Sequence, residues 1–198
     1  MPALNNSGAY GGLMAVRMMS GAELGLANEY SILAANGSAT FIGDPIEAQN
    51  TQDTADGTPN VILWSTGAHL LLGSVQSVKP TLTNLTLQYR VASTFTKVNI
   101  HDDPLTIFRI EDDGTALTGD VFEYATMVVG SGSTTTGQSA AVLHEASVTG
   151  TGTTSLPLKI RRAMPALGNT IEGTANTTVY EVIIVNHTFL QNATTALL

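Results

Sequence analysis

Two acidic turns contain the residues of this chain that are best suited to chemistry. The run His101-Asp102-Asp103 is the densest group of potential metal ligands, and the run Glu111-Asp112-Asp113-Gly114 follows it. A calcium loop needs several oxygen ligands at fixed spacing and a distal acidic residue, and neither run has that spacing. The first run precedes a proline and the second ends in Asp-Gly, which is typical of turns between strands. A cation site or a pair of catalytic carboxylates would require the two turns to meet.

The sequence has no other catalytic signature. Cysteine is absent, and neither a Gly-x-Ser-x-Gly elbow nor a His-Glu-x-x-His motif occurs. Trp64 could stack on a sugar, but it follows an apolar run, which favours a place in the core or in a subunit interface. The four histidines are scattered along the chain: His69, His101, His144 and His187. We therefore predict that the protein is not an enzyme and has no cofactor and no metal.

Charge also restricts the partners of the protein. The 198 residues include 8 basic and 16 acidic side chains, which gives a formal net charge of -8. The only basic cluster is the pair Arg161-Arg162. Binding to nucleic acid or to an acidic membrane relies on clustered Lys and Arg, so we predict neither partner. No signal peptide is evident at the start of the sequence, and its longest apolar run is too short to span a bilayer.

Protein partners remain, and two sets of residues are candidates for contacting them. Residues 1–28 are punctuated by glycine and follow no sustained apolar period, which predicts either a disordered terminus or an arm that orders against a neighbouring subunit. Arginine is favoured at interfaces and pairs with carboxylates in a bidentate manner. The candidate interaction residues are Leu13, Met14, Val16, Arg17, Met18, Met19, Arg90, Arg109, Arg161 and Arg162.

The elements that would position these residues are short strands. From residue 30 onward, apolar runs of three to nine residues alternate with turns rich in Gly, Asp, Asn and Pro. Residues 85–91 alternate strictly between apolar and polar side chains and predict a half-buried strand, whereas residues 179–185 are almost continuously apolar and predict a central one. We expect one helical turn at residues 118–123 and a loop of small residues at 130–137.

This pattern predicts an all-β fold, an antiparallel β-sandwich or barrel (jelly-roll-like) with an extended N-terminal arm. The domain organisation that we expect is an arm at residues 1–28, a β-rich core domain at residues 29–190 and a C-terminal tail at residues 191–198.

Several runs of residues form a recognisable series along the chain. They are Val16-Arg17, FIGDP (41–45), LQYRVAST (87–94), DDP (102–104), IFRIED (107–112), GSGSTTTGQS (130–139), LKIRR (158–162), NTIE (169–172), and Tyr180-Glu181-Val182 with Asn186-His187. In this order they resemble those of a family of structural proteins of tailed bacteriophages, the head decoration or capsid cement proteins. The resemblance spans roughly residues 11–187. It implies a β-rich subunit that binds the outer surface of the capsid, usually as a trimer, and it brings no catalytic residues.

We therefore expect a structural virion protein that clamps major capsid subunits together as a homo-oligomer and stabilises the expanded head. Many weak contacts made by one oligomer would act together through avidity. One alternative is a tail or fibre component that binds a host glycan, against which the 11 Phe, Tyr and Trp residues (5, 5 and 1) argue mildly. Another is a hydrolase, which would need the acidic turns to converge in a cleft.

Overall fold

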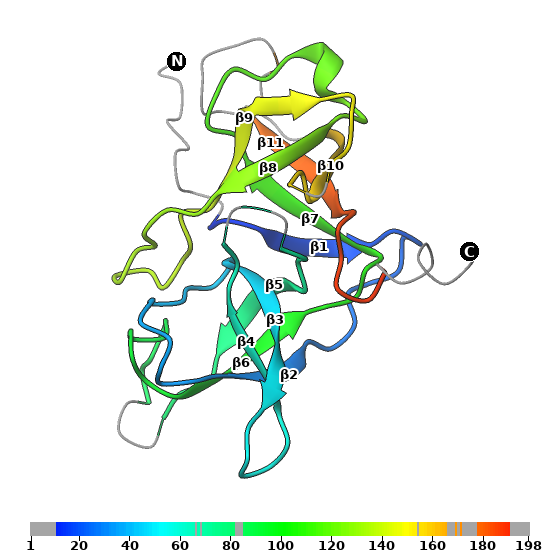
Figure 1. The fold of residues 1–198 in the computed structure, drawn as a ribbon. Coiled ribbons are helices and arrows are strands. Elements are labelled where there is room, and N and C mark those ends of the chain that lie inside the picture. The colour runs from blue at the N-terminus through cyan, green and yellow to red at the C-terminus, as the bar shows by residue number, and fades with distance from the viewer. Residues whose placement is uncertain are drawn as a thin grey trace, which may run out of the picture.

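The computed structural model describes residues 11–190, except 66, 68, 82–84, 154, 166–168, 170 and 172–177. Two β structures, a closed barrel and a six-stranded sheet, pack against each other (Figure 1). A 3-10 turn at Thr118–Asp120 is the helical element among the described residues, so the all-β prediction is confirmed. The strands are β1 (Met14–Met18), β2 (Asn28–Ile32), β3 (Pro45–Gln52), β4 (Pro59–Leu63), β5 (Gly73–Val78), β6 (Thr96–His101), β7 (Thr106–Glu111), β8 (Tyr124–Val128), β9 (Val142–Thr149), β10 (Leu158–Ala163) and β11 (Val179–Ile184).

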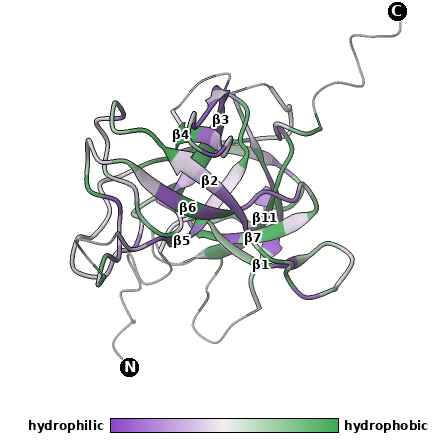
Figure 2. Ribbon diagram, turned by 90° about the horizontal axis from the view of Figure 1, so that it is seen from below, coloured by the Kyte–Doolittle hydropathy of each residue, from purple (hydrophilic) through white to green (hydrophobic). Residues whose placement is uncertain are grey.

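The barrel has the strand order β2-β4-β3-β5-β6 and closes where β6 pairs with β2. Its neighbours are antiparallel except β2 and β4, which pair in parallel at Ser31 and Asn60. Alternate residues of each strand point inward, so short runs are sufficient to fill the interior. Figure 2 shows these short hydrophilic and hydrophobic stretches along the strands. The barrel core is formed by Tyr30, Ile32, Ile46, Val61, Leu72, Val75, Val78, Val98 and Ile100.

The six-stranded sheet has the order β1-β7-β11-β10-β8-β9 and a separate apolar core on one face. Strand β11 lies between β7 and β10, as the apolar run at residues 179–185 predicts. Phe108, Tyr180 and Leu158 are among the buried residues of this core, and Trp64 joins it from the segment after β4. Trp64 is therefore a core residue, as expected, and not a sugar platform.

The expectation of an extended arm is corrected for the part of the N-terminal segment that the structure describes. Residues 1–10 lie outside the described residues, but Met14–Met18 is strand β1 and pairs with β7 in the same chain. Leu13 is completely buried in the core of the sheet. Its N–H donates to the carbonyl of Gly43 at 2.8 Å, where φ is +88° and a side chain would collide with the neighbouring backbone. Leu13 is thus covered by the chain itself and the residues of β1 are partly covered, whereas Met19 and Leu26 remain exposed.

A second correction concerns residues 85–91, whose alternation predicts a strand. The structure forms turns there, and Arg90 pairs with Thr40 in a single isolated bridge. Leu85 and Val91, which the alternation places on a buried face, are exposed. The predicted turn at 118–123 and loop at 130–137 are confirmed, and the predicted C-terminal tail lies outside the described residues.

Candidate interaction surface

Four of the five candidate arginines meet on the face of the sheet opposite its apolar core. Arg109 of β7 and Arg162 of β10 are the register partners of Glu181 in β11, one on each side. A β-bulge in β10 places Arg161 beside Arg162, and another in β1 precedes Arg17. We call Arg17, Arg109, Arg161 and Arg162, with Lys159 of β10, the basic face.

Glu181 is the centre of this face. Its carboxylate accepts two hydrogen bonds from Arg162, both 2.8 Å long, one from Arg161 at 2.7 Å and one from Arg17 at 2.9 Å. The Glu181 side chain is almost fully buried, whereas the three arginine side chains are 30–44% exposed. Hydrogen bonds from Arg162 lower the pKa of Glu181 to about 2, although burial acts in the opposite direction. One carboxylate therefore holds three exposed cations in fixed positions.

The basic face concentrates positive charge on an acidic protein. The sequence has 8 Lys and Arg residues, and the five on this face leave three elsewhere, Lys79, Arg90 and Lys97. Lys159 lies at the far end of the face, 4.6 Å from the ring centre of Tyr124. A fixed cluster of one sign on a protein of the other sign is suited to recognising an acidic surface.

An apolar groove of about 300 Å³ continues the basic face. Two prominent walls are Ile183 of β11 and Phe122, which precedes β8 and is 69% exposed. Phe122 has a φ of +68°, a conformation that is costly for a bulky residue and that often marks functional positions. Met19 from the candidate set also lines the groove, beside Lys159 and Arg161. We call this feature the basic groove.

Arg90 is not part of this surface, and its proposed role as an interface cation is wrong. Its side chain is completely buried and donates to the carbonyls of Thr94, Leu33 and Asn36 at 2.9 Å, and to that of Ser38. Burial lowers the pKa of the guanidinium. Arg90 therefore supports the turns around the barrel.

The remaining candidates lie at or near β1. Leu13 is buried in the core, so its predicted contact with a partner is wrong. Met14 and Val16 are partly buried in β1. Met18 lines a second hollow between the barrel and the sheet, and Met19 beyond it is exposed.

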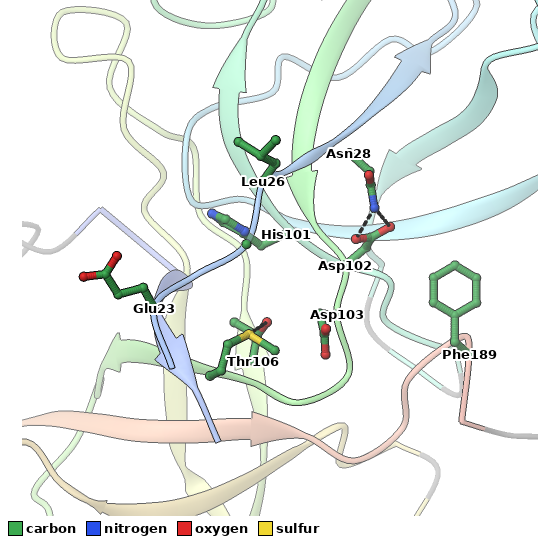
Figure 3. A pocket seen from close by; sticks show the side chains of 10 residues that line it. Glu23, Leu26, Asn28, His101, Asp102, Asp103, Thr106 and Phe189 are labelled. Atoms are coloured by element: carbon green, nitrogen blue, oxygen red, sulfur yellow. Dashed lines mark hydrogen bonds between the residues drawn. The ribbon is translucent and has the colours of Figure 1, made fainter. Parts of the chain in front are cut away.

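The second hollow has a volume of about 440 Å³ and contains the first acidic turn (Figure 3). Asp102 accepts hydrogen bonds from the amide of Asn28 at 2.9 and 3.0 Å and from the hydroxyl of Tyr30 at 2.5 Å. Burial lowers the pKa of His101 in the same wall, which favours its neutral form. We call this hollow the acidic pocket.

The two acidic turns do not converge. Asp103 precedes β7 and Asp112 follows it, so the length of that strand, roughly 20 Å for six residues, separates them. Asp113 instead bonds the His144 ring at 2.9 Å. Among the described residues, no group of three or more His, Asp or Glu is arranged to hold a metal ion. The two turns therefore do not come together as the shared cation site or carboxylate pair that their meeting would have allowed.

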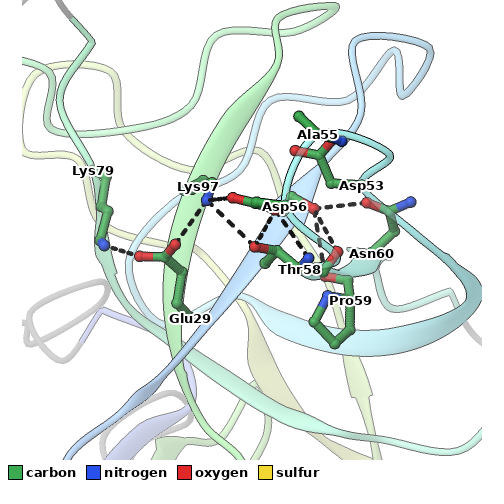
Figure 4. Close-up of polar contacts among 10 residues, drawn as sticks. Glu29, Asp53, Ala55, Asp56, Thr58, Pro59, Asn60, Lys79 and Lys97 are labelled. Atoms are coloured by element: carbon green, nitrogen blue, oxygen red, sulfur yellow. Dashed lines mark hydrogen bonds and ion pairs between the residues drawn. The ribbon is translucent and has the colours of Figure 1, made fainter.

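In one ion-pair network on the barrel, by contrast, cations and anions are balanced (Figure 4). Lys97 donates to Glu29 at 2.9 Å and also pairs with Asp56 in the β3–β4 connection. Lys79 pairs with the other oxygen of Glu29. The carboxyl of Asp56, bonded by Lys97, has a lowered pKa. Two lysines thus neutralise two carboxylates.

Sequence reasoning missed Glu181, Lys159 and Phe122. A single carboxylate within the apolar run of β11 is a usable signal, because a buried charge needs partners on neighbouring strands. For Phe122 the sequence offers no signal, since its exposure and positive φ depend on the turn before β8.

Comparisons with known proteins do not place the chain in a family. No protein-family model, curated protein or solved structure matches it. In the described part of the chain, no helix is long and apolar enough to cross a membrane.

Proposed function

We propose that this protein is a structural protein of a phage virion, which binds the outer surface of the capsid as a symmetric oligomer and clamps major capsid subunits together. The observation that carries the proposal is the basic face, where three exposed guanidinium groups surround one buried carboxylate beside an apolar groove. Arginine next to exposed aromatic and aliphatic side chains is the composition of protein-binding surfaces.

Two further observations support a binding role. Large apolar side chains remain exposed at several places on the described surface, including Leu26 at 98% and Leu85 at 75%. The runs that resemble capsid cement proteins include residues 107–112 and 158–162, which contain three of the four arginines of the face. The resemblance and the chemistry of the face therefore agree on a protein partner.

The direct test adds the purified protein to undecorated capsids of its phage. We expect the protein to co-sediment with the particles and to raise the temperature at which they rupture, because a ligand of the assembled state stabilises that state. Absence of binding, or an unchanged rupture temperature at saturation, would refute the proposal.

A matched pair of variants asks whether the basic face contributes. Arg162→Ser removes a cation whose side chain is 44% exposed, and Lys79→Ser removes one that is 46% exposed on the barrel. We expect the first variant to bind particles more weakly than the second. Binding to a glycan array in place of capsids would instead favour the tail or fibre alternative.

A further inference from the structure

Two hollows of opposite character lie at the end of β1. Met18 lines the acidic pocket and the next residue, Met19, lines the basic groove. The two hollows are therefore neighbours on the surface, separated by the chain as it leaves the sheet. Each has exposed apolar side chains at its rim. Among the described lining residues, the charged side chains of the groove are basic, and the pocket has no Lys or Arg.

The acidic pocket offers carboxylates to a partner. Glu23, Asp102 and Asp103 line it, and its described lining includes no Lys or Arg. Leu26 is 98% exposed beside it, and Phe189 is exposed on another wall (Figure 3). A cationic side chain with an adjacent apolar group would find both kinds of partner there.

The basic groove offers the complementary set. Lys159 and Arg161 are its charged lining residues, and Met19, Phe122 and Ile183 provide apolar surface. The groove is slightly smaller than the pocket, at about 300 Å³ against about 440 Å³. Phe122 is held outward in an unfavourable backbone conformation, which a purely structural residue at this position would not need.

We infer that copies of this chain associate with one another, with the basic groove of one copy on the acidic pocket of another. The inference rests on the self-association that the proposed function includes, and it names the surfaces that form the contact. From the basic face, the described lining of the groove includes Lys159 and Arg161 but not Arg17, Arg109 or Arg162, which leaves those three arginines for the capsid. The second copy is the occupant because it carries the complementary charge: outside the basic face the chain has few cations and nearly all of its acids.

The contact joins two different surfaces of the chain. Repeated in one direction, it closes into a ring or continues as a filament. Because the groove and the pocket lie next to each other, two copies can also make the contact reciprocally across a two-fold axis. In each closed arrangement every groove and every pocket is occupied.

The test uses one double variant for each surface. Phe122→Asn with Lys159→Glu alters the basic groove, and Glu23→Lys with Leu26→Ser alters the acidic pocket. Asparagine tolerates positive φ better than phenylalanine does, so the first variant is expected to keep or gain fold stability. Leu26 is almost fully exposed, so its replacement removes no core contact. The matched control, Lys79→Glu with Leu85→Ser, makes comparable changes on the barrel.

Light scattering after size-exclusion chromatography gives the mass of each species. We expect a closed oligomer of two or more copies for the wild-type chain and for the control, and the 20.6 kDa monomer for each double variant. In a mixture of the two double variants, one chain keeps an intact pocket and the other keeps an intact groove. These two chains can form a single contact, so we expect a dimer of twice 20.6 kDa that does not grow further. Circular dichroism and thermal melting confirm that each variant is folded.

Three results would overturn the inference: a monomeric wild-type chain, a double variant that keeps the wild-type mass, or a mixture that stays monomeric. The readout is separate from capsid binding. A wild-type oligomer that does not bind capsids would leave the inference intact and refute the proposed function. A monomer that binds capsids would refute the inference and keep the capsid-binding part of the proposed function.

Discussion

The barrel and the six-stranded sheet use their charged residues in opposite ways. On the barrel, Lys79 and Lys97 pair with Glu29 and Asp56, so the network is neutral (Figure 4). Its members are partly exposed lysines and carboxylates on strands and on the β3–β4 connection. Such pairs contribute little to stability, but they fix the connection against the barrel wall.

On the sheet, three guanidinium groups surround the single carboxylate of Glu181, and Arg109 and Lys159 lie on the same face. The carboxylate is buried and the cations are not. The single negative charge of Glu181 does not neutralise the three guanidinium groups that bond to it, so positive charge remains at the surface. The network on the barrel therefore has a structural role, whereas the basic face leaves cations available to bind a partner.

Arg90 is a barrel residue whose charge is used entirely inside the protein. Its replacement is expected to have the largest effect on stability. Its guanidinium donates to four backbone carbonyls in the interior. Arg90→Met removes the guanidinium donors of all four carbonyls, and of these four the carbonyls of Leu33 and Asn36 still accept a backbone N–H. We expect a loss of about 3 kcal/mol in the free energy of unfolding. Urea denaturation measures the loss. Arg90→Lys should not restore stability, because one ammonium group cannot reach all four carbonyls.

The oligomeric mass of the folded Arg90→Met fraction is expected to be unchanged. A loss below about 1 kcal/mol, within the range of exposed ion pairs, would show that the carbonyls find other donors. A change of mass at full stability would mean that Arg90 acts at an interface after all.

Glu181→Gln is expected to have the next largest effect. The variant leaves three guanidinium groups close together without a counter-charge, but their exposed sides remain solvated. We expect a loss of about 2 kcal/mol, less than for a fully buried pair. The matched change on the barrel, Glu29→Gln, is expected to cost less than about 1 kcal/mol. Equal losses in urea denaturation would contradict the contrast between the two regions.

The sequence predicts the fold class because short apolar runs and turn residues repeat along most of the chain. It fails at residues 85–91, where alternation satisfies the strand pattern but Arg90 supplies the hydrogen bonds that hold the turns. It fails again at β1, because glycines suggest an arm when Gly43 in fact permits close approach of the backbone. In both places long-range contacts override the local pattern.

The sequence predicts which residue type forms the basic face, but it does not predict which of these residues lie together. Arg17, Arg109, Arg161 and Arg162 are recognisable as interface candidates, but their meeting depends on the register of three strand pairs and on two bulges. The same residue type gives the wrong answer for Arg90. The sequence does not show that Arg90 is surrounded by backbone carbonyls, whereas Arg17, Arg161 and Arg162 share the carboxylate of Glu181.

The pH dependence of stability sharpens the contrast further. The pKa of Glu181 is lowered to about 2, so its contribution is complete above the ordinary value of 4.5 and is lost as the pH falls towards 2. The pKa values of Asp44 and Asp112 are raised to about 6 by burial, so their contributions are lost as the pH rises through that value.

Subtracting the unfolding free energies of wild type and Glu181→Gln at each pH removes the two aspartates, which both proteins share. We expect a difference that is constant above about pH 5 and that shrinks to near zero at about pH 2. Urea midpoints taken at successive pH values provide this curve. A difference that persists unchanged in acid would mean that glutamine disturbs packing and that the lost charge is not the cause.

The smallest effect is expected for Lys79→Ala on the barrel. Lys79 is 46% exposed and its charge meets Glu29 at the surface, so we expect a loss of about 0.5 kcal/mol in unfolding free energy. Salt at about 1 M should abolish this loss, because it screens exposed charges over a few ångströms. The loss for Glu181→Gln should largely persist in the same salt, since its carboxylate is buried. If salt reduced both losses equally, the contrast between the exposed ion pairs of the barrel and the buried carboxylate of Glu181 would be wrong.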